Sequence, residues 1–196
     1  MKHYTREDIE EKLHPGTEAD TQLGHDEEIR EFVEDLMVHD GDLTISGHLD
    51  YSKGQTLIKG DLIVDGTLSG DETGILVITG KLSCRNLYMA GTLDVVEASV
   101  KEAAFGFYEA GITSIQRISG KLLLVGNHSF EAEASGFEHV FEFDNYDSLS
   151  TGDGETLKAL LTDAGFKTVA NMVGLSKDDD GEKCWNAAFL DDGILR

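Results

Sequence analysis

The stretch GDLIVDG at residues 60–66 decides the fold, because close variants of it recur at nearly fixed intervals. The chain reads GDLTISG at residues 41–47, GKLSCRN at residues 80–86 and GKLLLVG at residues 120–126. It divides into five consecutive units of 19 or 20 residues, which begin at residues 41, 60, 80, 100 and 120. A repeat of this length is typical of a solenoid, in which each unit forms one coil.

Each unit combines spaced apolar residues with a later glycine or asparagine. Two residues after the opening position the units have Leu43, Leu62, Leu82, Glu102 and Leu122. Four residues after it they have Ile45, Val64, Cys84, Ala104 and Leu124, and six after it Gly47, Gly66, Asn86, Gly106 and Gly126. Apolar residues two apart lie on one face of a strand, and Gly or Asn permits the positive φ of a sharp corner. We therefore predict a mainly β fold, a right-handed parallel β-helix (β-solenoid) of about five 20-residue coils.

The fourth unit departs from this pattern, because Glu102 falls in the leucine column. A β-bulge or a one-residue slip would restore the register; the alternative is an inward-facing Glu102. Other repeat folds fit less well. A leucine-rich repeat needs a recurring Asn and a helical half, a left-handed hexapeptide helix needs a period of six, and a pentapeptide column needs a period of five.

The flanks predict helical caps at both open ends of the column. HDEEIREFVEDLMVHD at residues 25–40 has an apolar helical stripe, and an earlier helix is expected over residues 5–14. TLKALLTDAG at residues 156–165 predicts an amphipathic helix that ends at Gly165. The tail that follows carries Trp185, Phe189 and Leu190, which we expect to pack in the cap. The predicted domains are an N-terminal helical cap (1–40), the β-helix (41–145) and a C-terminal helix with a capping tail (146–196).

The chain of 196 residues has a formal net charge of −22, with 13 acidic and 4 basic residues in residues 1–40. Such a field repels nucleic acid and anionic membranes and favours encounter with a basic partner. There is no apolar signal segment at the start, and no apolar run approaches the length of a membrane span. The sequence thus predicts a cytoplasmic protein, with Cys84 as a small core residue.

No pattern of catalytic or metal-binding residues stands out. The seven histidines are scattered, and no nucleophile elbow, P-loop or dinucleotide-binding motif occurs in the required context. We therefore predict no catalytic residue, no metal site and no cofactor. Asp42 and Asp61 share a column that we expect to continue through Lys81, Lys101 and Lys121 as a solvated edge. DDDG at residues 178–181 lacks the spacing of a calcium loop and indicates a polar turn.

The recurring Gly-x-Leu…Gly phrase over residues 41–128 resembles the bactofilin domain, a short right-handed β-helix that polymerises end to end. The resemblance implies a self-assembling scaffold. The chain departs from it in its longer period, its amphipathic flanks and its strong negative charge.

From these features we predict a non-enzymatic acidic binding protein, such as an immunity protein that neutralises a basic toxin, as a monomer or small homo-oligomer. A bactofilin-like scaffold is the alternative, and a carbohydrate-active β-helix enzyme is less favoured. The candidate partner-binding residues are Asp65, Asp71, Glu72, Glu131, Glu133, Glu142 and Asp144.

Overall fold

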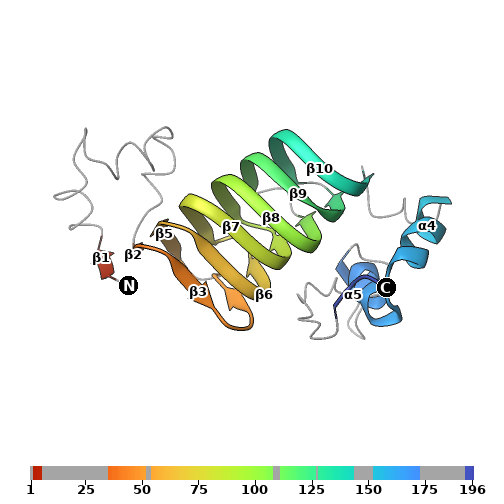
Figure 1. Ribbon diagram of the computed structural model, residues 1–196, viewed down its shortest axis with the longest axis horizontal. Coiled ribbons are helices and arrows are strands. Elements are labelled where there is room, and N and C mark those ends of the chain that lie inside the picture. Colours follow the sequence, from red (N-terminus) through yellow and green to blue (C-terminus); the bar gives the residue numbers. More distant parts are fainter. Residues whose placement is uncertain are drawn as a thin grey trace.

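The computed structural model describes residues 2–5, 35–51, 54–107, 111–126, 128–143, 152–172 and 193–196. In these ranges the strands are β1 (Lys2–Thr5), β2 (Asp35–Asp40), β3 (Leu43–Ile45), β4 (Leu49–Asp50), β5 (Gln55–Lys59), β6 (Leu62–Gly70), β7 (Ile75–Met89), β8 (Thr92–Phe107), β9 (Ile112–Gly126) and β10 (Ser129–Phe143). The helices are α4 (Gly152–Leu160) and α5 (Asp163–Met172). Figure 1 shows the strands as a column with both helices beside it.

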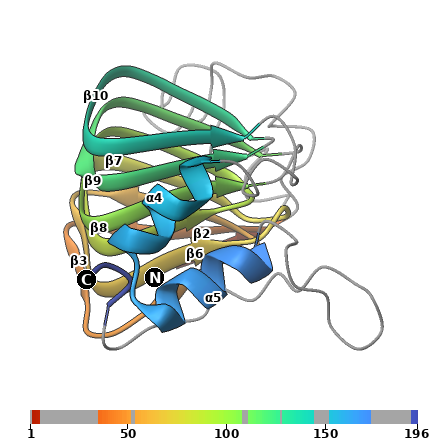
Figure 2. The same cartoon turned by 90° about the vertical axis from the view of Figure 1, so that its right-hand side faces the viewer.

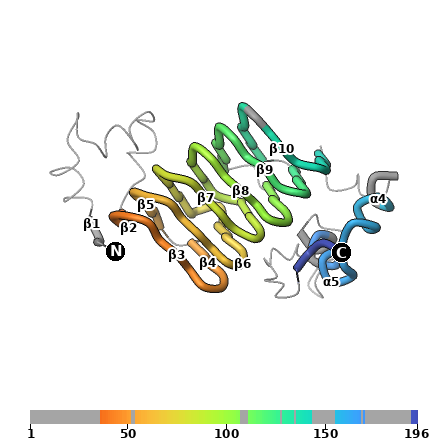
Figure 3. Tube along the Cα trace, viewed as in Figure 1, coloured from red at the N-terminus to blue at the C-terminus, as the bar shows by residue number. Residues whose placement is uncertain are grey.

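The strands form a parallel β-solenoid of about five coils, as the repeat predicts. Along one path β1, β2, β5, β7, β8, β9 and β10 pair in that order, while β3 and β4 pair with β6, which pairs with β7. All these pairs are parallel except β1 with β2, which is antiparallel. The Cα trace in Figure 3 shows the chain passing from one coil directly to the next.

Each coil contributes to three sheet faces. The first face contains residues 36–40, 55–59, 75–79, 92–96, 112–116 and 129–133. The second face contains residues 43–45, 62–64, 81–84, 97–100, 117–119 and 134–137. The third face contains residues 49–50, 67–70, 86–89, 103–107, 122–126 and 139–143.

Inward side chains of successive coils stack into apolar ladders. On the second face the ladder contains Leu62, Leu82, Ala98 and Ile118, and on the third face it contains Leu68, Leu87, Ala104 and Leu123. All eight are at most 5% exposed. Burying one leucine side chain contributes about 1.5–3 kcal/mol, so these ladders stabilise the column substantially. Cys84 lies in this core, as predicted, and burial raises the pKa of its thiol to about 12.

The coils are not equal in length. Gln55 pairs with Ile75, twenty residues later, whereas Ile75 pairs with Thr92 after only seventeen. The step from Thr113 to Phe130 is also seventeen residues. The predicted units of twenty residues are therefore wrong for these two coils, because shorter corners connect the faces there.

The shorter coil corrects the predicted columns in the fourth unit. The leucine column continues through Ala98 and Ile118, not through Glu102 and Leu122. The column is displaced by four residues, so the one-residue slip is wrong as the explanation; the register shifts before Asn86 and before Ala103 lie at the next corner and do not bring Glu102 into the ladder. The side chain of Glu102 is directed away from the core, and its Oε2 accepts a hydrogen bond from the backbone N of Ile194 at 2.9 Å.

The predicted corner glycines hold at Gly47 and Gly66, for two different physical causes, whereas Gly106 and Gly126 lie on the third face within β8 and β9 and are not corner residues as predicted. Gly47 has a φ of 97°, which confirms the predicted positive φ at that corner. Gly66 is not among the glycines with positive φ. There, an added Cβ would lie 2.6 Å from the backbone O of Gly47, so the stacking of neighbouring corners excludes a side chain.

The predicted helix over residues 25–40 is wrong for its last six residues, which form strand β2. This strand pairs in parallel with β5, and its Leu36 and Val38 are buried. The consecutive apolar residues Leu36, Met37 and Val38 fit a strand as well as part of a helical stripe, and pairing with β5 decides between them. Residues 25–34 and 6–14 of the predicted helices lie outside the described residues, as do Trp185, Phe189 and Leu190. The solenoid thus begins at β2 rather than at residue 41.

The C-terminal helices lie against the flank of the column. Outward side chains of the third face form one apolar cluster with the C-terminal region. The column contributes Tyr88, Ala103, Phe105, Leu122, Leu124 and Phe141, and the C-terminal region contributes Leu157, Leu161, Phe166, Val169, Ile194 and Leu195. Figure 2 shows the molecule from the side that carries both helices. The predicted cap over the end of the column is therefore wrong for α4 and α5, because four coils offer an apolar flank instead.

The predicted helix over residues 156–165 is interrupted at Leu161 and Thr162. The C-terminal segment enters this break, where the backbone N of Thr162 donates to the O of Ile194 at 2.9 Å. Thr162 Oγ1 then accepts from the backbone N of Gly165 at 3.0 Å and caps the start of α5. Gly165 does not end a helix as predicted, because it lies within α5. A Cβ there would lie 2.5 Å from the O of Ile194, so the docked segment requires glycine.

Candidate partner-binding site

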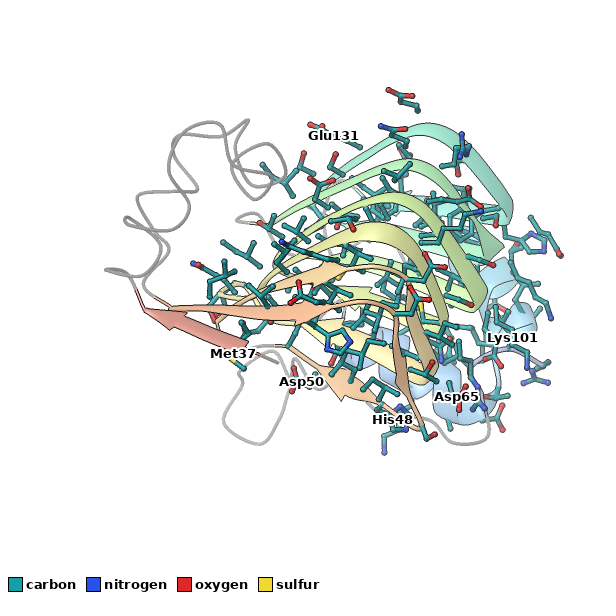
Figure 4. The ribbon with its side chains drawn as sticks, turned by 60° about the vertical axis from the view of Figure 1, so that its left-hand side comes forward. Met37, His48, Asp50, Asp65, Lys101 and Glu131 are labelled. Atoms are coloured by element: carbon teal, nitrogen blue, oxygen red, sulfur yellow. The ribbon has the colours of Figure 1, made fainter. Side chains whose placement is uncertain are left out.

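The structure does not bring the seven predicted acidic residues together. Asp65, Asp71 and Glu72 lie in the second coil, at the corner within β6 and in the turn after it. Glu131, Glu133 and Glu142 lie on β10, at the other end of the column. Figure 4 shows Asp65 and Glu131 on separate parts of the molecule. Asp144 lies outside the described residues.

Asp71 has a structural role in its turn. Its Oδ1 accepts hydrogen bonds from Thr73, at 2.9 Å from the backbone N and 2.7 Å from Oγ1. An aspartate that bonds to the backbone two residues later stabilises a tight turn. The carboxylate of Asp71 is thus already used within the fold, which makes the acidic residues of β10 the better candidates for a binding site.

Strand β10 forms an unpaired edge within the described part of the chain. It pairs with β9 over its whole length, and no described strand pairs with its other side. Such an edge presents a row of backbone N–H and C=O groups that can pair with another extended segment. The last coil is therefore a place where a partner can extend the sheet.

The inward side chains of β10 are incompletely covered. Phe130, Ala132 and Phe137 pack against the inner core but are only partly buried, and Val140 is 49% exposed. Glu142 also occupies an inward column, because it pairs with Val125, which packs against the core. This end of the column thus combines apolar surface with a carboxylate.

The other glutamates of β10 are exposed on its outer side. Glu131 and Glu133 lie on the first face. Glu138 lies between the second face, which ends at Phe137, and the third face, which begins at His139. Residues 129–143 contain four glutamates and neither lysine nor arginine. Among the described residues these carboxylates have no hydrogen bond or ion pair. Glu138 was not among the partner-binding residues predicted from the sequence, although it belongs to the same glutamate-rich stretch, FEAEASGFEHVFEF.

Basic residues lie in the middle coils instead. On the second face Glu97 is in register with Lys81 and Arg117 and forms ion pairs with both, at 3.2 and 2.9 Å. Hydrogen bonds from Arg117 and Lys81 lower the pKa of Glu97. The column that begins with Asp42 and Asp61 thus continues through these three residues. The prediction that Lys101 and Lys121 belong to this column is wrong. Each lysine follows the paired residues Ser99 and Ser119 by two positions, so neither is in register with Glu97 and Arg117.

The opposite end of the column differs from the β10 end in one respect. Its edge on the first face is closed, because β1 pairs with β2 over Asp35–Val38. It too is acidic, because residues 36–51 contain Asp40, Asp42 and Asp50 and no lysine or arginine. The first and last coils therefore both carry acidic residues, whereas Lys81 and Arg117 lie in the coils between them and Lys2 lies on β1 at the N-terminal edge.

The described ranges contain neither a cluster of metal-binding side chains nor a helix suited to a membrane. No three His, Cys, Asp or Glu side chains there are grouped so as to hold a metal ion. Neither α4 nor α5 has the length and apolar character that crossing a membrane requires. In comparisons with known proteins, no family model, curated protein or solved structure matches this chain.

Proposed function

We propose that this protein is a non-enzymatic binding protein that captures a cationic protein through the last coil of its solenoid. An immunity protein that neutralises a basic toxin is the clearest example of such a role. The observation that carries the proposal is the edge of β10, where exposed glutamates lie beside the side of the strand that no described strand pairs with. A rigid column also loses little conformational entropy when it binds, which favours recognition.

Charge reversal at the β10 edge tests this proposal. The double variant Glu131→Lys/Glu133→Lys replaces two attractive contacts by two repulsive ones, and each exposed contact is worth about 0.2–1 kcal/mol. We expect its dissociation constant for a decalysine peptide, used as the probe, to rise about tenfold at low salt. Isothermal titration calorimetry at low and moderate ionic strength measures this change, which salt should reduce.

The matched control changes the same number of charges elsewhere. Asp65→Lys/Glu72→Lys gives the same net charge, but its substitutions lie in the second coil. We expect this variant to bind decalysine within about twofold of the original protein. Equal weakening in both variants would mean that only the overall field attracts the peptide, and the proposed site would then be wrong.

A bactofilin-like scaffold is the second candidate, and the position of α4 and α5 favours it. Both helices pack on the flank, so they do not prevent another column from approaching β10. The charges oppose this function, because end-to-end contact would bring the acidic first coil against the glutamates of the last coil. An inward carboxylate such as Glu142 at a sheet end also discourages stacking.

Light scattering after size-exclusion chromatography distinguishes these two functions. For the binding protein we expect a constant mass of one or two chains across a wide concentration range, at both low and moderate salt. A mass that rises with concentration, more strongly at moderate salt where repulsion between the ends is screened, would favour the scaffold.

A further inference from the structure

The two ends of the first face differ in how their backbone groups are satisfied. At the N-terminal end β1 adds an extended segment to the edge of β2, with Lys2 opposite Val38 and Thr5 opposite Asp35. At the other end residues 129–133 pair with β9 on one side, and no described strand lies on the other. At the N-terminal end the chain itself adds a strand to the edge of the sheet, whereas at the β10 end no described strand does so.

We propose that the edge formed by residues 129–133 binds an extended cationic segment of the partner as an added strand. This inference rests on the proposed function and specifies how the partner is recognised. Strand addition derives its affinity from main-chain hydrogen bonds and its specificity from alternate side chains. The edge of β10 supplies the main-chain groups without rearrangement, because β9 already holds them in an extended conformation.

The register of β10 defines the side chains of that segment. Phe130 and Ala132 continue the inward ladders, since they pair with Thr113 and Ile115. Glu131 and Glu133 point outward and are exposed. A strand added about 4.8 Å away places its own residues directly beside these side chains. The segment therefore carries small apolar residues next to Phe130 and Ala132, and lysine or arginine next to the two glutamates.

A second copy of this chain does not meet these requirements. Its first coil has acidic residues and no lysine or arginine in residues 36–51, and β1 already covers the edge of β2 on the first face. The outer side of its last coil repeats the same glutamates. Charge complementarity thus points to a different, basic chain.

Four synthetic peptides with the same amino acids and the same net charge, two of them N-methylated, test strand addition. The first, acetyl-TVKVKVKG-amide, places all its lysines on one side of a strand, whereas acetyl-TVVVKKKG-amide places them on both. The third repeats the first with N-methyl groups on its valines, which removes backbone donors but keeps every charge. We expect the alternating peptide to bind at least tenfold more tightly than the block peptide by fluorescence anisotropy. A companion peptide methylated on the lysines instead identifies which set of N–H groups faces β10, and one of the two methylated peptides should lose binding.

Amide hydrogen exchange gives a second measurement on the full chain. Bound alternating peptide should slow exchange within residues 129–133, and the effect should be absent in Glu131→Lys/Glu133→Lys. If all peptides bind equally, and the double variant weakens them all, strand addition is wrong while the proposed acidic site remains. If the double variant weakens none of them, or if no peptide binds, the proposed site itself is wrong.

Discussion

Replacing Leu87 by alanine is expected to lower the free energy of unfolding by about 2–5 kcal/mol. Leu87 is completely buried, and it stands in the inward ladder between Leu68 and Ala104. The substitution would leave a cavity that cannot close easily, because hydrogen-bonded strands fix the backbone of the coils on both sides of Leu87. Urea denaturation followed by far-ultraviolet circular dichroism measures the change, with the slope of the transition checked for constancy.

Ser99→Ala is the matched control for this substitution. Ser99 lies in the neighbouring coil within an equally well-paired strand, but its side chain is exposed. We expect its effect to stay within about 0.5 kcal/mol. A loss below about 1 kcal/mol in Leu87→Ala would contradict the inward ladder, because it would mean that the position is not packed on all sides.

The coil pattern was predictable because it depends on local chemistry. A glycine that recurs about every twenty residues and apolar residues two apart within the strands indicate a stacked β fold without any long-range information. The exact register was not predictable across the third coil. The repeat places Leu122 in the same column as Leu82, yet Ile118 occupies the ladder, where it pairs with Ala98. An apolar residue favours burial of its position, but it does not show on which side of the sheet the side chain is buried.

The apolar outer side of the third face explains why the sequence does not identify the inner side of the sheet. Leu122 and Leu124 face outward, and they are buried because the C-terminal region covers them. A sheet that is apolar on both sides loses the alternation that normally identifies its inner face. The sequence of α4 and α5 predicts an apolar helical face, but not the surface that this face covers.

The candidate site was predictable in part. Glu131, Glu133 and Glu142 were identified from their charge, and the same reasoning selected Asp71, which the fold uses in a turn. Charge alone does not distinguish these cases. The distinction depends on which strand lacks a neighbour, and that property belongs to the assembled column.

Replacing Leu157 by aspartate is expected to detach α4 and α5 from the column. Leu157 is completely buried in the cluster that joins α4 to the third face. An unpaired carboxylate in that position costs several kcal/mol unless it reaches water. We expect the helices to leave the flank and expose Tyr88, Phe105 and Leu124, which would increase the fluorescence of an apolar dye severalfold.

The column itself should survive this substitution, because its inner core is a separate cluster that does not include Leu157. Far-ultraviolet circular dichroism should therefore retain the strand signal, while amide exchange accelerates in α4 and α5 and remains slow at Leu87 and its neighbours. Ala159→Asp is the control, since it adds the same carboxylate to an exposed position of α4. If both variants behaved alike, the helices would not be held by the apolar flank. If Leu157→Asp unfolded the strands as well, the flank and the column would form one cooperative unit, because the inner ladders alone would not sustain the solenoid.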